Sequence, residues 1–156
     1  MSFIGNITAA QTAKAIGKYN QSVLNTQAAY DRKKAEIRKE VYEKFDKPRY
    51  VANQNIFMRD QFVTTLKTGA EFRAGETGYL VYLKNLQNQA TDLAINDYNE
   101  TVKENDLINQ SILLRARGEG ERYKGDMTAR SEYIKAAGSL LGMGYNYNQS
   151  GRLIIN

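Results

Sequence analysis

Two pairs of carboxylates are the residues of this chain best suited to chemistry. Glu100 and Glu104 lie four residues apart, and Asp92 and Asp97 precede them, so on a helix they could hold a metal or exchange protons. The chain contains no histidine, cysteine or tryptophan, which removes the common zinc ligands, thiol nucleophiles and histidine bases. Without such partners we interpret the carboxylates as a solvated helix face. We expect no enzymatic activity, no cofactor and no metal.

Two glycine-rich stretches could be mistaken for phosphate-binding loops. They cover residues 68–78, TGAEFRAGETG, and residues 116–126. Neither follows an apolar strand or contains G-x-x-x-x-G-K-[ST], so both lack the context of a phosphate loop. Each glycine costs about 1 kcal/mol within a helix relative to alanine, which predicts a bend at 67–78 and a flexible joint at 118–126. The predicted hinge residues are Pro48, Gly69, Gly75, Gly78, Gly118, Gly120 and Gly125.

Basic residues gather in two places that could contact the phosphates of nucleic acid. The first is DRKKAEIRK, residues 31–39, and the second lies at 115–124. Binding through phosphates would depend on salt and not on base sequence. Acids are interleaved at Asp31, Glu36 and Glu40, so a solvated or interprotein salt-bridge face is the alternative for the first group. The candidates for contact with DNA or a partner are Arg32, Lys33, Lys34, Arg38, Lys39, Arg115, Arg117, Arg122 and Lys124.

The elements that carry these residues are predicted to be helices. Between about residues 8 and 45, large apolar residues follow spacings of three, four or seven, a narrow stripe typical of a coiled-coil seam. The stripe consists of Ile16, Tyr19, Val23, Tyr30, Ile37, Val41 and Phe45. Pro48 must interrupt or kink this helix because it lacks an N–H. Helical spacing resumes at 53–66, so a kinked helix is favoured, and two helices joined by a short turn are the alternative.

We therefore predict an all-α fold, an elongated long-helix hairpin that forms a single domain and assembles as a ring or tube. The net charge of +5 is uneven: residues 13–49 carry ten basic and five acidic residues, and residues 50–114 carry five and eight. Helices packed against neighbours of opposite sign would give this pattern. The predicted parts are kinked N-terminal helices (1–66), a glycine-rich bend (67–78), a long helix (79–117), a flexible joint (118–126), a C-terminal helix (127–144) and a tail (145–156).

Small apolar residues near the C-terminus are candidates for helix packing or membrane contact. They are Ala137, Gly138, Leu141 and Gly142 within AAGSLLGMG, and the G-x-x-x-G spacing lets helices approach closely. No window approaches the roughly 18 consecutive apolar residues of a membrane-spanning helix. The first residues also lack the pattern of a secretory signal. A single copy would therefore not cross a bilayer alone, although several copies in a ring could build a wall.

Three segments in this order resemble the internal virion proteins of T7-like short-tailed bacteriophages, the internal virion protein B family. They are AAQTAKAIGKYNQ, the central AGETG followed by YLVYLKNL, and AAGSLLGMG. The resemblance implies a non-enzymatic protein that belongs to the core stacked on the portal inside the virion. At infection the protein would be ejected into the host cell envelope, where it would help to form a channel that conducts phage DNA across the outer membrane. Implied partners are copies in a ring, other internal virion proteins, portal or tail proteins, phage DNA bound non-specifically and the host outer membrane.

One departure from this family concerns the N-terminus. The family often has a strongly apolar N-terminal segment, whereas this chain keeps Gln11, Lys14 and Lys18 there, which argues against direct insertion by this segment. Two other interpretations stay open. The chain could be a basic helical virion protein that contacts packaged DNA, or a cellular coiled-coil scaffold.

Overall fold

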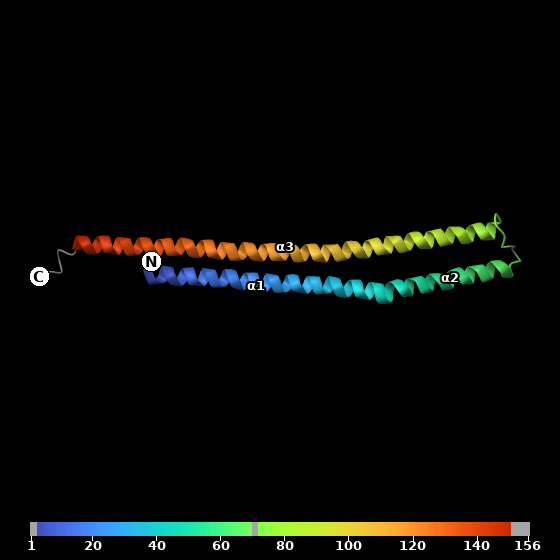
Figure 1. The fold of residues 1–156 in the computed structure, drawn as a ribbon, viewed down its shortest axis with the longest axis horizontal. Helices are drawn as coiled ribbons and strands as arrows, with labels where there is room; N and C mark the ends of the chain where they lie inside the picture. Colours follow the sequence, from blue (N-terminus) through green and yellow to red (C-terminus); the bar gives the residue numbers. More distant parts are fainter. Residues whose placement is uncertain (1–2, 70–71, 151–156) are drawn as a thin grey trace. The chain divides into compact units, whose positions relative to one another are not determined.

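The chain is helical, as predicted. The computed structural model describes residues 3–69 and 72–150, the last nine of these without their side chains, and no strand occurs in these ranges. The element order is α1 (Phe3–Val41), a π-helical turn η1 (Tyr42–Asp46), α2 (Lys47–Lys67) and α3 (Thr77–Ser150) (Figure 1).

Helix α3 runs without interruption through the region where a flexible joint was predicted. It contains the whole of 118–126, so the joint and the separate C-terminal helix at 127–144 are wrong. It also includes residues 145–150 of the predicted tail, whereas 151–156 lie outside the described residues. At Gly125, α3 approaches α1 too closely for a side chain, whereas a Cβ on Gly118 would lie 3.4 Å from its nearest neighbours, an ordinary contact. The missing side chain of Gly125 therefore serves packing and not bending.

Helix α1 passes into α2 through the π-helical turn, and no loop separates them. Val41, Asp46 and Lys47 all keep right-handed helical angles. The N–H of Lys47 donates to the carbonyl oxygen of Tyr42, five residues back. The ring of Pro48 crowds the preceding helical turn and removes a donor, and the wider turn before it accommodates both effects. The alternative of two helices joined by a short non-helical turn is wrong.

The connection between α2 and α3 contains the only left-handed glycines among the described residues. Gly69 has a φ of 75° and Gly75 a φ of 94°, angles that favour glycine over other residues. Gly78 was predicted to be a hinge residue, but it already belongs to α3. A Cβ on Gly78 would lie 2.7 Å from Cγ2 of Thr65, so this glycine allows close packing.

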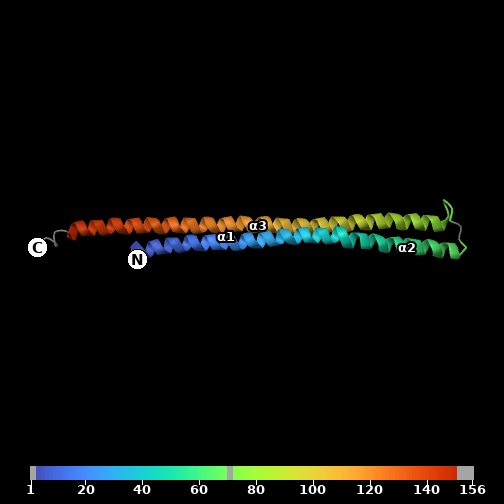
Figure 2. The same ribbon diagram turned by 60° about the horizontal axis from the view of Figure 1, so that its bottom comes forward.

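The contacts divide the chain into two units. Unit 1 comprises Met1–Tyr30 and Gln110–Asn156, and unit 2 comprises Asp31–Asn109. In unit 1 the first part of α1, blue in the figures, lies beside the orange part of α3 in both views (Figures 1 and 2). Gly17 lies against Gly125 and Gln21 against Gly118, so the two helices of unit 1 are antiparallel.

Small residues form the buried contact of unit 1. A Cβ on Gly125 would lie 2.8 Å from the carbonyl oxygen of Ala13 and 2.9 Å from Cα of Gly17. Both are backbone atoms, so the helices are too close for any side chain at this point. The buried apolar residues of unit 1 are Ala10, Ala28, Ala129 and Ala136, each at most 3% exposed. The contact therefore combines very close approach with little buried apolar volume.

In unit 2 an aromatic cluster joins the connection to both of its helices. Phe72 of the connection lies 4.8 Å from Phe62 of α2 and 5.5 Å from Tyr82 of α3, measured between ring centroids, with edge-to-face geometry. Tyr79 adds a third such contact at 5.6 Å. Edge-to-face pairs are favourable beyond the area they bury. The cluster therefore holds the two helix ends on either side of the connection.

Candidate functional site

The large apolar stripe predicted on the first helix is exposed along its length. In unit 1, Ile16, Val23 and Tyr30 lie seven residues apart and are 54%, 46% and 67% exposed. We call these three residues the α1 stripe. Ile37, 49% exposed, continues the spacing in unit 2. Because the small residues of α1 make the contact with α3, the α1 stripe is left without cover inside unit 1. Large apolar side chains that stay exposed in a row along one helix face are candidates for an interaction surface.

The α1 stripe also borders a shallow depression on the helix surface. Val23 and Tyr30 form its apolar walls, and Ser22, Thr26 and Gln27 complete it. A depression flanked by large residues at seven-residue spacing has the form of a hole that receives a side chain from a second helix. The surface is therefore suited to a helical partner.

The predicted packing segment near the C-terminus also faces outward. Ala137 and Gly138 are exposed, and Leu141 is 76% exposed. No heavy atom of the described residues lies within 4 Å of a Cβ built on Gly138. Ala136 is the buried neighbour, at 3% exposure. The surroundings of Gly142 lie outside the described residues, so only Gly138 of the G-x-x-x-G pair is seen, and it packs against none of the residues that the structure describes.

Comparison with protein-family models, curated proteins and solved structures found no match. Within the described ranges, no three residues of the types Asp, Glu, His and Cys are grouped as a metal site. No helix in the described part of the chain is long and apolar enough to span a bilayer.

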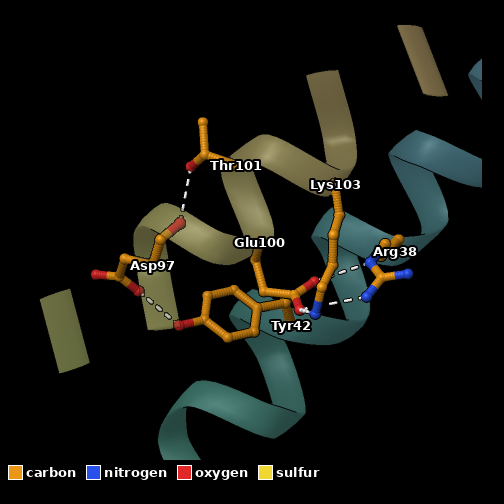
Figure 3. Close-up of polar contacts among 6 residues, drawn as sticks. All are labelled: Arg38, Tyr42, Asp97, Glu100, Thr101 and Lys103. Carbon is orange, nitrogen blue, oxygen red and sulfur yellow. Dashed lines mark hydrogen bonds and ion pairs between the residues drawn. The ribbon is translucent and has the colours of Figure 1, made fainter. Parts of the chain in front are cut away.

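The carboxylates interpreted as a solvated face instead bind basic residues of the opposite helix in unit 2. Arg38 donates to Glu100 twice, from Nε to Oε2 at 2.8 Å and from Nη2 to Oε1 at 3.3 Å (Figure 3). Lys103, on the same helix as Glu100, adds a 2.6 Å contact to Oε1. Nζ of Lys39 lies 3.6 Å from Oε1 of Glu104. The prediction of a solvated face is wrong for these carboxylates, because antiparallel pairing places basic residues beside them.

Asp97 is the second acidic centre of unit 2. Tyr42 donates its hydroxyl to Oδ1 at 2.7 Å (Figure 3), and Lys47 donates to Oδ2 at 2.8 Å. Thr101 donates to the backbone carbonyl of Asp97 at 2.9 Å. The remaining carboxylate of the predicted pairs, Asp92, is exposed. These contacts position helices and contain no histidine or cysteine that could act as a base or nucleophile.

The ion pairs shift the ionisation of their members. Hydrogen bonds from Arg38 and then Lys103 lower the pKa of Glu100 to about 2. Hydrogen bonds from Lys47 and Tyr42 lower the pKa of Asp97. Burial, followed by the hydrogen bond to Asp97, raises the pKa of Tyr42 to about 12. The folded chain therefore favours the ionised carboxylates and the protonated tyrosine.

We expect stability to fall in acid because of Glu100. An unfolded glutamate takes up a proton below its ordinary pKa of 4.5, whereas the folded one resists until about 2. The contribution is therefore complete above pH 4.5 and is lost progressively as the pH falls towards 2. Glu100→Gln should flatten this part of the curve of unfolding free energy against pH, measured by urea titration. Glu119→Gln, at an exposed position, is the control, and an equal flattening in both variants would contradict the assignment.

The basic candidates for DNA contact have different surroundings. Arg38 and Lys39 are used in the ion pairs of unit 2, Lys33 lies 3.6 Å from Glu36, and Arg122 lies 3.9 Å from Asp126. These pairs reduce the positive field at the first group. The residues 32–39 belong to unit 2 and 115–124 to unit 1. The other exposed candidates are Arg32, Lys34, Arg115, Arg117 and Lys124.

Proposed function

We propose that this chain is a non-enzymatic structural protein that assembles with copies of itself. The α1 stripe carries this proposal. Its large apolar residues stay exposed while alanine and glycine make the contact inside unit 1. Covering large apolar side chains is the dominant gain in association, and a protein that binds its own copies gains stability as its concentration rises.

Within this role, we propose an internal virion protein of a T7-like bacteriophage. The support is the resemblance of the three segments named above, together with an all-helical chain that buries mostly small residues. In this proposal residues 67–78 form the bend of a helical hairpin, and copies form a ring or tube in the core above the portal. After ejection, they line the channel that conducts phage DNA across the host outer membrane. Few large buried side chains would have to separate if the chain unfolds on the way out.

The assembly proposal is tested by sedimentation of the purified full-length chain over a wide range of concentrations. We expect species heavier than the 17.7 kDa monomer that dissociate on dilution. A monomer at every concentration would contradict the proposal. The virion role is tested separately by mass spectrometry of purified particles of a phage that encodes the chain. Absence of the chain from the particles would exclude that role and leave self-assembly intact.

Non-specific DNA contact is a second candidate, favoured by exposed basic residues along α3. Arg115, Arg117 and Lys124 are all exposed in unit 1. We expect duplex DNA to bind weakly and to be released as salt rises, because each phosphate contact releases counterions. Changing these three residues to glutamine should reduce the slope of log affinity against log salt by about 3 × 0.9. An unchanged slope would exclude contact through this group.

A further inference from the structure

A second apolar seam follows the exposed side of α3 in unit 1. Its members alternate between steps of three and four residues over four heptads, and all are exposed. Leu113, Ile134 and Leu141 are 58%, 73% and 76% exposed. We call this set the outer seam. It consists of Leu113, Ala116, Gly120, Tyr123, Met127, Arg130, Ile134, Ala137 and Leu141.

The described residues do not explain Gly120. It lies in the middle of a helix, where glycine costs about 1 kcal/mol relative to alanine. Gly125 of the same helix is explained by backbone atoms of α1 that lie 2.8 and 2.9 Å from its Cβ position. Around Gly120, the described residues place no heavy atom within 4 Å. Gly120 lies in the outer seam, and Gly138, equally open, lies next to Ala137. A helix outside this chain would explain both.

The seam also specifies what kind of partner covers it. Large and small apolar residues at steps of three and four form the seam of a helix pair, whose side chains interlock with those of a second helix. Eight of its nine members are apolar or glycine, and Arg130 is the exception. An extended peptide, whose side chains recur every two residues, would not match a seven-residue repeat. The occupant that this spacing fits best is therefore a helix.

We propose that the outer seam binds the outer seam of a second copy of this chain, with the two α3 helices antiparallel. This inference rests on the proposed self-assembly and names one of its contacts. The two-fold axis lies near residue 128, so that Gly120 of one copy meets Ala137 of the other. Small residues then face each other at two symmetric points. The same type of contact already exists inside unit 1, where Gly17 faces Gly125.

Charge determines the orientation. In a parallel pair in register, Arg130 would lie against Arg130 of the second copy in the middle of the seam, and like charges there repel. In the antiparallel pair, Arg130 lies beside Met127 and Asp126 of the second copy. Asp126 is partly exposed, and its ion pair with Arg122 is long, at 3.9 Å, so it can accept a further cation. Tyr123 then packs against Ile134, and Ala116 against Leu141.

The absence of cysteine from the chain allows a direct test by crosslinking. Ala116→Cys and Ala137→Cys are made separately in the full-length chain, both at exposed alanines. Each variant is treated alone with a short thiol-specific crosslinker. A mixture of the two variants is treated in the same way. In the antiparallel pair, residue 116 lies about one helical turn from residue 137 of the second copy. In the same pair, each cysteine lies about 25 Å or more along the helix axis from the identical cysteine of the second copy, at a rise of about 1.5 Å per residue.

We expect a crosslinked dimer from the mixture and little from either variant alone. Crosslinking by either variant alone indicates a parallel pair and overturns the inference. If sedimentation shows assembly and no sample crosslinks, the outer seam is not the contact, although self-assembly stands. If the chain is monomeric and nothing crosslinks, both proposals fail. As a second measurement, Gly120→Leu should weaken association at least tenfold without loss of helix, and unchanged association would also overturn the inference.

Discussion

Replacing Gly125 with leucine should separate the two helices of unit 1 and lower the free energy of unfolding by about 3 kcal/mol. The new Cβ would lie 2.8 Å from the carbonyl oxygen of Ala13 and 2.9 Å from Cα of Gly17. Neither backbone atom can move aside without moving α1 as a whole. Movement of α1 would also open the contacts of Ala10 and Ala129, so the loss extends along the unit. Thermal and urea unfolding followed by circular dichroism measure the effect.

The matched control is Gly120→Leu in the same helix. The described residues leave open space at its Cβ position. In solutions dilute enough to prevent association, this variant should gain about 0.5–1 kcal/mol, because leucine favours helix over glycine. The two substitutions are chemically identical, so their different surroundings should alone give the changes in unfolding free energy opposite signs. Equal effects would show that helix propensity dominates and that the contact between Gly17 and Gly125 contributes little.

Placing two glutamates in the α1 stripe should weaken self-association by about 100-fold or more. Burial of a side chain such as valine or isoleucine contributes about 1.5–3 kcal/mol, and Ile16→Glu with Val23→Glu removes two of them. Both residues are exposed in the single chain, so the helix content should not change. Sedimentation equilibrium compares the dissociation constants, and circular dichroism confirms that the variant is folded.

The control for this pair is Ala15→Glu with Ala29→Glu, one residue before Ile16 and Tyr30 and outside the depression beside the α1 stripe. It adds the same charge at two exposed positions of the same helix, turned by about 100° around its axis. Association should fall less than tenfold. If the control weakens association as strongly as the stripe variant, net charge and not the α1 stripe governs assembly.

The sequence was sufficient to predict helices but not what the glycines do in them. Periodicity identified the helical segments, and Gly69 and Gly75 do lie outside them. The joint at 118–126 was wrong because glycine can serve either bending or close packing, and composition alone does not distinguish them. A signal was present: Ala10 and Gly17, Gly118 and Gly125, and Ala129 and Ala136 are each seven residues apart. Small residues at this spacing on two helices indicate a close contact.

The ion pairs of unit 2 illustrate a different limit of prediction. The uneven charge indicated that basic and acidic helices would meet, and Arg38 and Lys39 do bind Glu100 and Glu104. Which residues pair depends on the register between the helices. The ends of the connection set that register, and helical periodicity contains no information about it. The partners were therefore missed although the signs of their charges were apparent.

The π-helical turn at Tyr42–Asp46 limits how far along the chain a partner can bind. A straight partner helix on α1 would pack against side chains that recur at nearly the same angle around the helix axis. A turn of wider pitch inserts a fraction of a rotation, so side chains beyond Asp46 point in a direction that the same straight partner cannot follow. In the proposed assembly, one straight partner helix would therefore pack along α1 only as far as this turn, and α2 would need a separate partner.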